Sequence, residues 1–94
     1  MSSRPDRVRA VYDEAHELCV RKDADYGDAV SIYGSVGVLI RVGDKLNRLA
    51  KLTRGGVQFV QDESLRDTLI DLANYAALAI TLLDEAQDSA GSEV

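Results

Sequence analysis

The sequence contains few of the residues that covalent catalysis uses. Its 94 residues include one cysteine, one histidine, one proline and no tryptophan. The single thiol, Cys19, excludes an intramolecular disulfide and argues against a zinc site built from cysteine pairs. The chain also lacks a glycine-rich phosphate loop, a dinucleotide-binding glycine pattern and a serine or cysteine triad signature. These absences argue against a covalent mechanism.

Positive charge is also scarce. The 11 Lys and Arg residues are outnumbered by 16 Asp and Glu residues, which gives a net charge of −5. A protein that binds duplex nucleic acid normally presents a basic face to the phosphates, so the charge balance argues against that role. A small phosphorylated ligand remains compatible, because the positive charges are clustered along the chain.

Long apolar runs are missing as well. No stretch reaches the ~20 apolar residues needed to cross a bilayer, and the N-terminus does not resemble a signal peptide. The sequence therefore predicts a cytoplasmic protein without a membrane partner.

The sequence is rich in aliphatic residues that recur at helical spacing. Hydrophobic residues make up 46% of the chain and aromatic residues only 5%, a composition that favours helices. We predict a single all-α domain over residues 1–86 and a flexible tail over 87–94. The predicted helices of this three-helix protomer cover about residues 5–22, 35–54 and 62–85. Residues 2–6 (SSRPD) have the pattern of a helix start, with a Ser cap followed by Pro and an acidic residue in the first turn.

The segments between the predicted helices are less regular. Residues 23–28 are rich in Asp and Gly and indicate a turn. Residues 29–33 are compatible with either a short helix or an extended piece, closed by Gly34. Gly55 and Gly56 are expected to end the second helix, and Asp62 is expected to cap the third.

The second half of the third predicted helix, over residues 76–83, is apolar on nearly every side. A helix of this kind must be buried, and two partner helices of this length cannot cover it. The sequence therefore predicts a homo-oligomer, a dimer or a tetramer, in which this helix packs across a symmetry axis.

A row of polar residues runs along the other side of the same helix. Glu63, Asp67, Asp71 and Asn74 follow one another at spacings of four, four and three. At 100° per residue these side chains fall within an arc of roughly 80°. Such a row either faces water or binds a cation, and a divalent metal is the strongest candidate.

The second predicted helix carries positive charges that complement this row. Arg41, Lys45 and Arg48 share one side with Asp44, whereas aliphatic residues line the other side. Carboxylates for Mg²⁺ and cations for phosphates are the groups that phosphoryl chemistry uses. Two ordinary alternatives stay open, because acidic residues favour the start of a helix and Asp44 can pair with Arg48 on the surface. Glu14 and Glu17 form a weaker candidate ligand pair.

Three blocks of the sequence, taken together, resemble the "nucleotide modification associated domain 1" family, which occurs mainly in bacteriophages and bacteria. The resemblance spans roughly residues 10–85. The blocks are residues 22–27 (KDADYG), 37–49 (GVLIRVGDKLNRL) and 63–75 (ESLRDTLIDLANY). That family is often grouped with the MazG-like all-α nucleoside triphosphate pyrophosphohydrolases. Those enzymes are oligomeric helical bundles that use Mg²⁺ to release pyrophosphate.

The chain departs from the MazG-like hallmark of E-x-x-E on one helix and E-x-x-D on a later one. It offers Asp44-x-x-Asn47 and Asp71-x-x-Asn74 instead. The resemblance implies roles for eleven residues. Mg²⁺, or Mn²⁺, would be held by Asp44, Glu63, Asp67 and Asp71, with Asp67 and Asp71 catalytic. The substrate would be bound by Lys22, Arg41, Lys45 and Arg48 at its phosphates, by Tyr26 and Asn74 near its base or sugar, and by Asp25.

Three functions therefore remain open at the level of sequence. The first is a Mg²⁺-dependent nucleotide pyrophosphohydrolase. The second is a non-catalytic protein that binds a nucleotide, sequesters a nucleotide signal or assists phage DNA modification. The third is a structural helical oligomer whose polar stripes face water.

Overall fold

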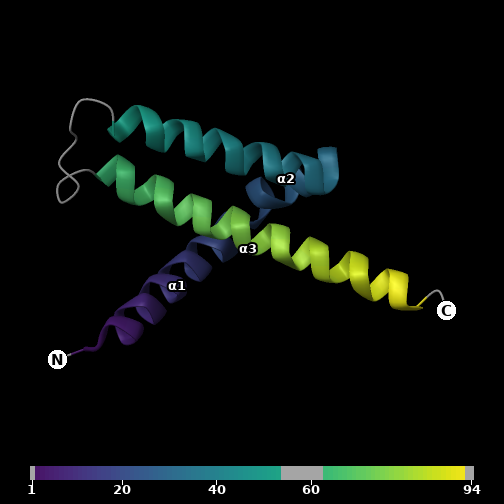
Figure 1. Cartoon of the computed structure of the whole chain (residues 1–94), viewed down its shortest axis with the longest axis horizontal. Helices are drawn as coiled ribbons and strands as arrows, with labels where there is room; N and C mark the ends of the chain where they lie inside the picture. Colours follow the sequence, from purple (N-terminus) through teal and green to yellow (C-terminus); the bar gives the residue numbers. More distant parts are fainter. Residues whose placement is uncertain (1, 54–62, 93–94) are drawn as a thin grey trace.

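The described part of the chain is entirely helical, as the sequence predicts. A computed structural model describes residues 2–53 and 63–92, which form α1 (Arg4–Arg21), α2 (Asp23–Thr53) and α3 (Glu63–Ser92) (Figure 1). No strand occurs within these ranges. None of the helices described here is long and apolar enough to cross a membrane. The predicted end of the second helix at Gly55–Gly56 and the predicted cap at Asp62 lie outside the described residues.

The start of α1 follows the predicted capping pattern. The Ser3 hydroxyl accepts a hydrogen bond from the backbone N–H of Asp6 at 3.2 Å. The Asp6 carboxylate accepts one from the backbone N–H of Ser3 at 3.4 Å. With Pro5 in the first turn, these bonds satisfy N–H groups that a helix start leaves without partners.

The turn predicted over residues 23–28 is instead the beginning of α2. Only Lys22 separates α1 from α2, and the backbone N–H of Tyr26 donates to the Lys22 carbonyl at 3.1 Å. Asp23 and Asp25 lie in the first turn of α2, where their negative charges interact favourably with the helix dipole. The acidic residues that indicated a turn therefore stabilise a helix start.

Gly34 divides α2 into two helical halves. Its φ of 63° and ψ of −144° are non-helical, and this left-handed backbone is one that glycine adopts without strain. Of the two conformations that the sequence left open for residues 29–33, the structure has the helix. The kink turns the second half of α2 back along α3, to which it runs antiparallel (Figure 1).

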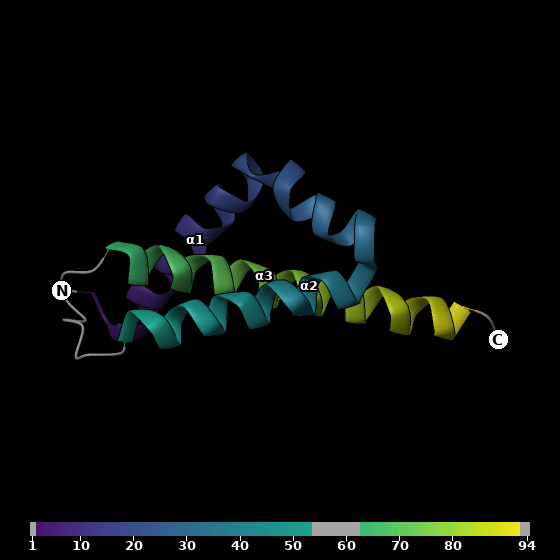
Figure 2. The same ribbon diagram turned by 90° about the horizontal axis from the view of Figure 1, so that it is seen from above.

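The antiparallel pair formed by the second half of α2 with α3, here called the hairpin, is the centre of the fold. α1 crosses α3 obliquely, and the first half of α2 rises on one side of the hairpin (Figures 1 and 2). Among the side chains that the structure describes, few hydrophobic ones are buried: Ala15, Tyr26, Val38, Leu65 and Ile70. α3 continues to Ser92, so residues 87–92, predicted as part of a tail, belong to the helix.

Candidate functional site

A pocket of about 270 Å³ lies between the C-terminal end of α1 and the first half of α3. Two cations, Arg21 and Lys22, and two aspartates, Asp67 and Asp71, contribute to its wall. The remaining lining residues are Glu14, Leu18 and Ile70. The predicted acidic row of α3 thus faces positive charge contributed by the end of α1.

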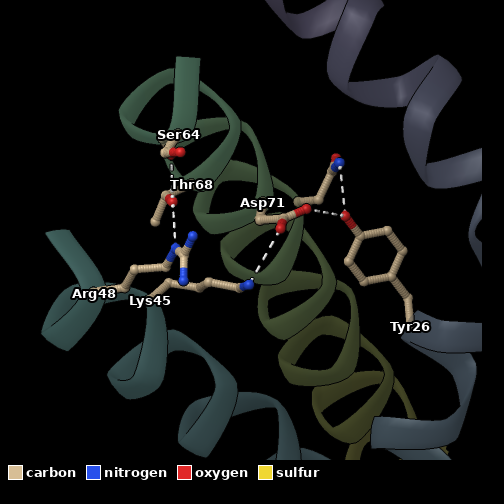
Figure 3. A network of polar contacts seen from close by, with 7 residues as sticks. Tyr26, Lys45, Arg48, Ser64, Thr68 and Asp71 are labelled. Carbon is tan, nitrogen blue, oxygen red and sulfur yellow. Dashed lines mark hydrogen bonds and ion pairs between the residues drawn. The ribbon is translucent and has the colours of Figure 1, made fainter. Parts of the chain in front are cut away.

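Asp71 is the centre of a polar network that joins α3 to both halves of α2 (Figure 3). Its carboxylate accepts a hydrogen bond from the Tyr26 hydroxyl at 3.0 Å. The other carboxylate oxygen pairs with Lys45 Nζ at 3.2 Å. Both charged side chains keep about a quarter of their surface exposed (25% for Lys45 and 22% for Asp71), so the pair is still accessible to a ligand.

Asn74 and Tyr26 continue this network into the core. The Asn74 side-chain amide donates to the Ala15 carbonyl at 2.9 Å and to the Tyr26 hydroxyl at 3.3 Å. Tyr26 and Asn74 are 4% and 7% exposed. The Tyr26 ring also packs edge-to-face with Tyr75, with ring centroids 4.9 Å apart. Asn74 therefore links α1, α2 and α3, and its side chain is not presented to solvent.

Burial, the largest cause, raises the pKa of Tyr26 to about 12; the hydrogen bond from Asn74 opposes this rise, and the hydrogen bond to Asp71 and its charge add to it. Burial likewise raises the pKa of Tyr75, while Arg41 lowers it and the charges of Asp71 and Asp25 add to the rise. Arg41 and Asp25 thus lie within electrostatic reach of the Tyr26–Tyr75 pair.

This shift predicts a loss of stability at alkaline pH. Because the folded pKa of Tyr26 lies above the unfolded value of about 10, its contribution to stability is complete below pH ~10 and is lost as pH rises toward ~12. Tyr26→Phe should reduce the slope of unfolding free energy against pH in this window, measured by urea unfolding at a series of pH values. The exposed Tyr12 provides the control, and equal slopes for Tyr26→Phe and Tyr12→Phe would contradict the assignment.

Two further polar contacts join α3 to the other helices. Arg48 Nε donates to Thr68 Oγ1 at 3.2 Å, and the Thr68 hydroxyl donates to the Ser64 carbonyl at 2.6 Å. Arg66 donates to the two carboxylate oxygens of Glu14 through its two terminal guanidinium nitrogens, Nη1 and Nη2, at 2.5 and 2.7 Å. The hydrogen bonds from Arg66 lower the pKa of the Glu14 carboxyl. The Arg66–Glu14 pair joins residues 52 positions apart, and no spacing in the sequence signals it.

The structure brings most of the predicted site residues together. Lys22, Asp67 and Asp71 line one pocket, and Tyr26, Lys45 and Asn74 belong to the network around Asp71. Of the other five, Arg48 binds Thr68 on α3, and Arg41 and Asp25 act on the pKa of Tyr75. The remaining two are not placed at the site. Asp44 is exposed and makes no hydrogen bond or ion pair within the described ranges, and the Glu63 side chain lies outside what the structure describes. Glu14, from the weaker candidate pair, lines the pocket, whereas Glu17 is not among its lining residues.

The carboxylates of the pocket suit a metal ion that a phosphorylated ligand also helps to hold. Within residues 2–53 and 63–92, no group of three or more His, Cys, Asp or Glu side chains is arranged to hold a metal ion. Mg²⁺, however, is usually held by one or two carboxylates together with substrate phosphates and water. Asp67 and Asp71 therefore fit a Mg²⁺ ion that arrives with a phosphorylated ligand.

Comparison with known proteins agrees with the resemblance drawn from the three sequence blocks. A family model described as "nucleotide modification associated domain 1" matches residues 22–83. No curated protein and no solved structure matches the chain. The matched range contains Lys22, all of α2 and the acidic row of α3, and it excludes Glu14 and Arg21. Because the match covers well over half of the chain, the protein belongs to the nucleotide modification associated domain 1 family.

Proposed function

We propose that this protein binds a nucleotide through its phosphates in the pocket between α1 and α3. In this proposal Mg²⁺ arrives with the nucleotide. Water then cleaves a phosphoanhydride bond of the bound nucleotide, which releases pyrophosphate. The observation that carries the proposal is the composition of the pocket, where Arg21 and Lys22 stand beside Asp67 and Asp71. The description of the family, which mentions nucleotide modification, agrees with a nucleotide ligand.

The cations supply the phosphate-binding half of the site. Arginine presents several donors in a planar fork that matches phosphate oxygens, and lysine adds a compact charge. Lys45, at 3.2 Å from Asp71, can exchange this partner for a phosphate oxygen. That exchange leaves a carboxylate oxygen of Asp71 free to contact the metal ion.

The aspartates Asp67 and Asp71 supply the metal-binding half of the site. A Mg²⁺ ion on Asp67 and Asp71 would neutralise phosphate charge and lower the pKa of a bound water. Asp67 would hold the metal, and Tyr26 would keep Asp71 in place through its hydrogen bond of 3.0 Å. Tyr75, packed against Tyr26, offers an aromatic surface for the base.

A second function, nucleotide binding without turnover, is supported by a different observation. The Asp71 carboxylate already has two internal partners, Tyr26 and Lys45, and the described residues form no three-carboxylate group. In that case the acidic residues would only position the cations. The protein would sequester a nucleotide or a nucleotide-derived signal, or would assist the modification of phage DNA.

The working form in either case is a homo-oligomer, dimer or tetramer, located in the cytoplasm, where nucleotides are available. For a phage-encoded protein this is the cytoplasm of the host.

A thermal-shift panel of nucleoside mono-, di-, tri- and cyclic phosphates, with and without Mg²⁺, tests the proposal. A ligand that binds only the folded chain raises its melting temperature with concentration. A Mg²⁺-dependent shift accompanied by pyrophosphate release supports the hydrolase. A shift that EDTA does not change, with the nucleotide recovered intact, supports binding alone. No shift with any nucleotide would contradict both functions.

Arg21→Glu is expected to weaken binding of the best ligand by at least ~10-fold, because it replaces a phosphate-binding cation with a repelling charge. Isothermal titration calorimetry measures the change. Arg9→Glu makes the same charge reversal on the exposed surface of α1, away from the pocket, and should change affinity less than ~2-fold. Equal effects of the two substitutions would show that only the net charge matters.

A further inference from the structure

The hairpin leaves a large apolar surface uncovered. On α2, Leu39 and Leu46 are 59% and 53% exposed. On α3, Leu69, Ile80 and Leu83 are 40%, 58% and 57% exposed. Leu39 lines a single groove together with Ile80 and Leu83, so exposed apolar residues of the two helices meet there.

The residues of this surface repeat with the spacing of packed helix bundles. On α2, an aliphatic residue recurs at intervals of three, four and three. On α3 the intervals are four, three, four, three and four. The α2 residues are Leu39, Val42, Leu46 and Leu49, and the α3 residues are Leu65, Leu69, Leu72, Ala76, Ala79 and Leu83. This alternation is that of the a and d positions that form the core of helical bundles.

Only half of this repeat is covered within one chain. Val42 and Leu49 on α2, and Leu72 and Ala79 on α3, are half-buried, whereas Leu39 and Leu46 face solvent. In a four-helix bundle, both the a and the d positions of every helix are buried. The hairpin therefore has the surface pattern of one half of such a bundle.

The uncovered surface lies opposite the candidate site. At 100° per residue, Leu69 and Ile80 project roughly 160–180° around α3 from Asp71. Tyr26, from the first half of α2, binds Asp71, so that half covers the site's side of the hairpin. Figure 2 shows this half of α2 on one side of the hairpin and no described helix on the opposite side. A partner on the uncovered side would leave the pocket open.

The size and chemistry of the surface suit a second copy of this chain. Two helices, each about 10–12 Å wide and several turns long, offer an area comparable with the ~800 Å² that each partner buries in a standard stable complex. The repeat contains no charged residue, so it does not call for a partner of opposite charge. Few hydrophobic side chains are buried among those that the structure describes, which indicates that a partner adds stability to this short chain. A second copy is always present with the first.

We propose that two copies associate through the aliphatic repeat of the hairpin to form a four-helix bundle, made of the second half of α2 and α3 from each copy. A two-fold axis relates the copies, because one self-complementary surface serves both. The two candidate sites then lie on the outer sides of the bundle. This inference rests on the homo-oligomer of the proposed function and deepens it by naming the surface through which the copies meet. Its test requires no nucleotide, so it can fail without affecting the nucleotide site.

Analytical ultracentrifugation of the full chain over a range of concentrations tests the proposal. The wild-type chain is expected to sediment with at least twice its monomer mass of 10.2 kDa. Leu83→Glu should raise the dissociation constant at least ~10-fold, because it places an unpaired charge in the interface. Val20→Glu, at a position on α1 that is 63% exposed and outside the repeat, is the matched control. A monomeric wild-type chain, or equal effects of the two substitutions, would overturn the proposal.

A cross-linking measurement covers the case in which Leu83→Glu does not fold. Cys19 is replaced by Ser in two variants, one carrying Ala76→Cys within the repeat and one carrying Val20→Cys outside it. A short bifunctional maleimide should link two Ala76→Cys chains and leave Val20→Cys chains unlinked. The reverse pattern would place the contact elsewhere and overturn the assignment of this surface.

Discussion

Asp67→Asn is expected to reduce the rate of pyrophosphate release at least ~100-fold, which corresponds to about 2.7 kcal/mol of transition-state stabilisation. The amide removes the negative charge that would hold Mg²⁺, but it keeps the size of the side chain. Asp67 is exposed and lines the pocket, so the fold should be unaffected. Single-turnover kinetics with the nucleotide identified by thermal shift, together with the melting temperature of the variant, measure both effects.

Asp84→Asn provides the control for this substitution. Asp84 is an exposed aspartate on the same helix and does not line the pocket, so its replacement should leave the rate within ~2-fold of wild type. If Asp67→Asn keeps the wild-type rate, Asp67 does not hold the metal. If the wild-type chain binds the nucleotide and releases no product, the protein belongs to the binding class and Asp67 serves only to position cations.

Much of the fold follows from local sequence patterns. Periodic aliphatic residues predict all three long helical segments, and Ser3, Pro5 and Asp6 predict the start of α1. The turn predicted at residues 23–28 was wrong because Asp residues favour both turns and the first turns of helices. The choice depends on whether the following residues continue the helix. Here Tyr26 packs against Tyr75 of α3, a contact that no local pattern contains.

The sequence predicts which site residues share a face of one helix, but it does not predict which residues of different helices come into contact. The spacing of Asp67, Asp71 and Asn74 places them together on α3. Two of the predicted α2 cations reach this helix, Lys45 at Asp71 and Arg48 at Thr68. On α1, Glu14 was a weak candidate, but Arg21 and the pairing of Glu14 with Arg66 were missed. Glu14 and Arg66 are 52 residues apart, and each resembles an ordinary surface charge. Likewise, the repeat through Leu39 and Leu46 predicts a buried stripe, although one chain leaves both residues more than half exposed.

Asn74→Ala separates the predicted role of Asn74 from the one that its contacts indicate. The sequence predicts a ligand-binding amide, but this side chain donates to the Ala15 carbonyl at 2.9 Å and to the Tyr26 hydroxyl at 3.3 Å, and it is only 7% exposed. Replacing it by Ala removes both hydrogen bonds and the side-chain volume at the point where α1, α2 and α3 meet, while the Tyr26 hydroxyl keeps its bond to Asp71. We expect the free energy of unfolding to fall by about 2–3 kcal/mol, measured by urea unfolding followed by circular dichroism.

Asn47→Ala is the matched control, because Asn47 is an exposed asparagine on α2. Both substitutions gain the same few tenths of a kcal/mol of helix propensity, so the difference between them isolates the lost contacts. Both must be compared at one protein concentration, since the stability of a self-associating chain depends on concentration. If the two variants are equally stable and only Asn74→Ala loses nucleotide affinity, the Asn74 side chain binds the nucleotide directly. A loss of stability in the absence of nucleotide instead shows that Asn74 holds α1 and Tyr26 in place around the Asp71 carboxylate.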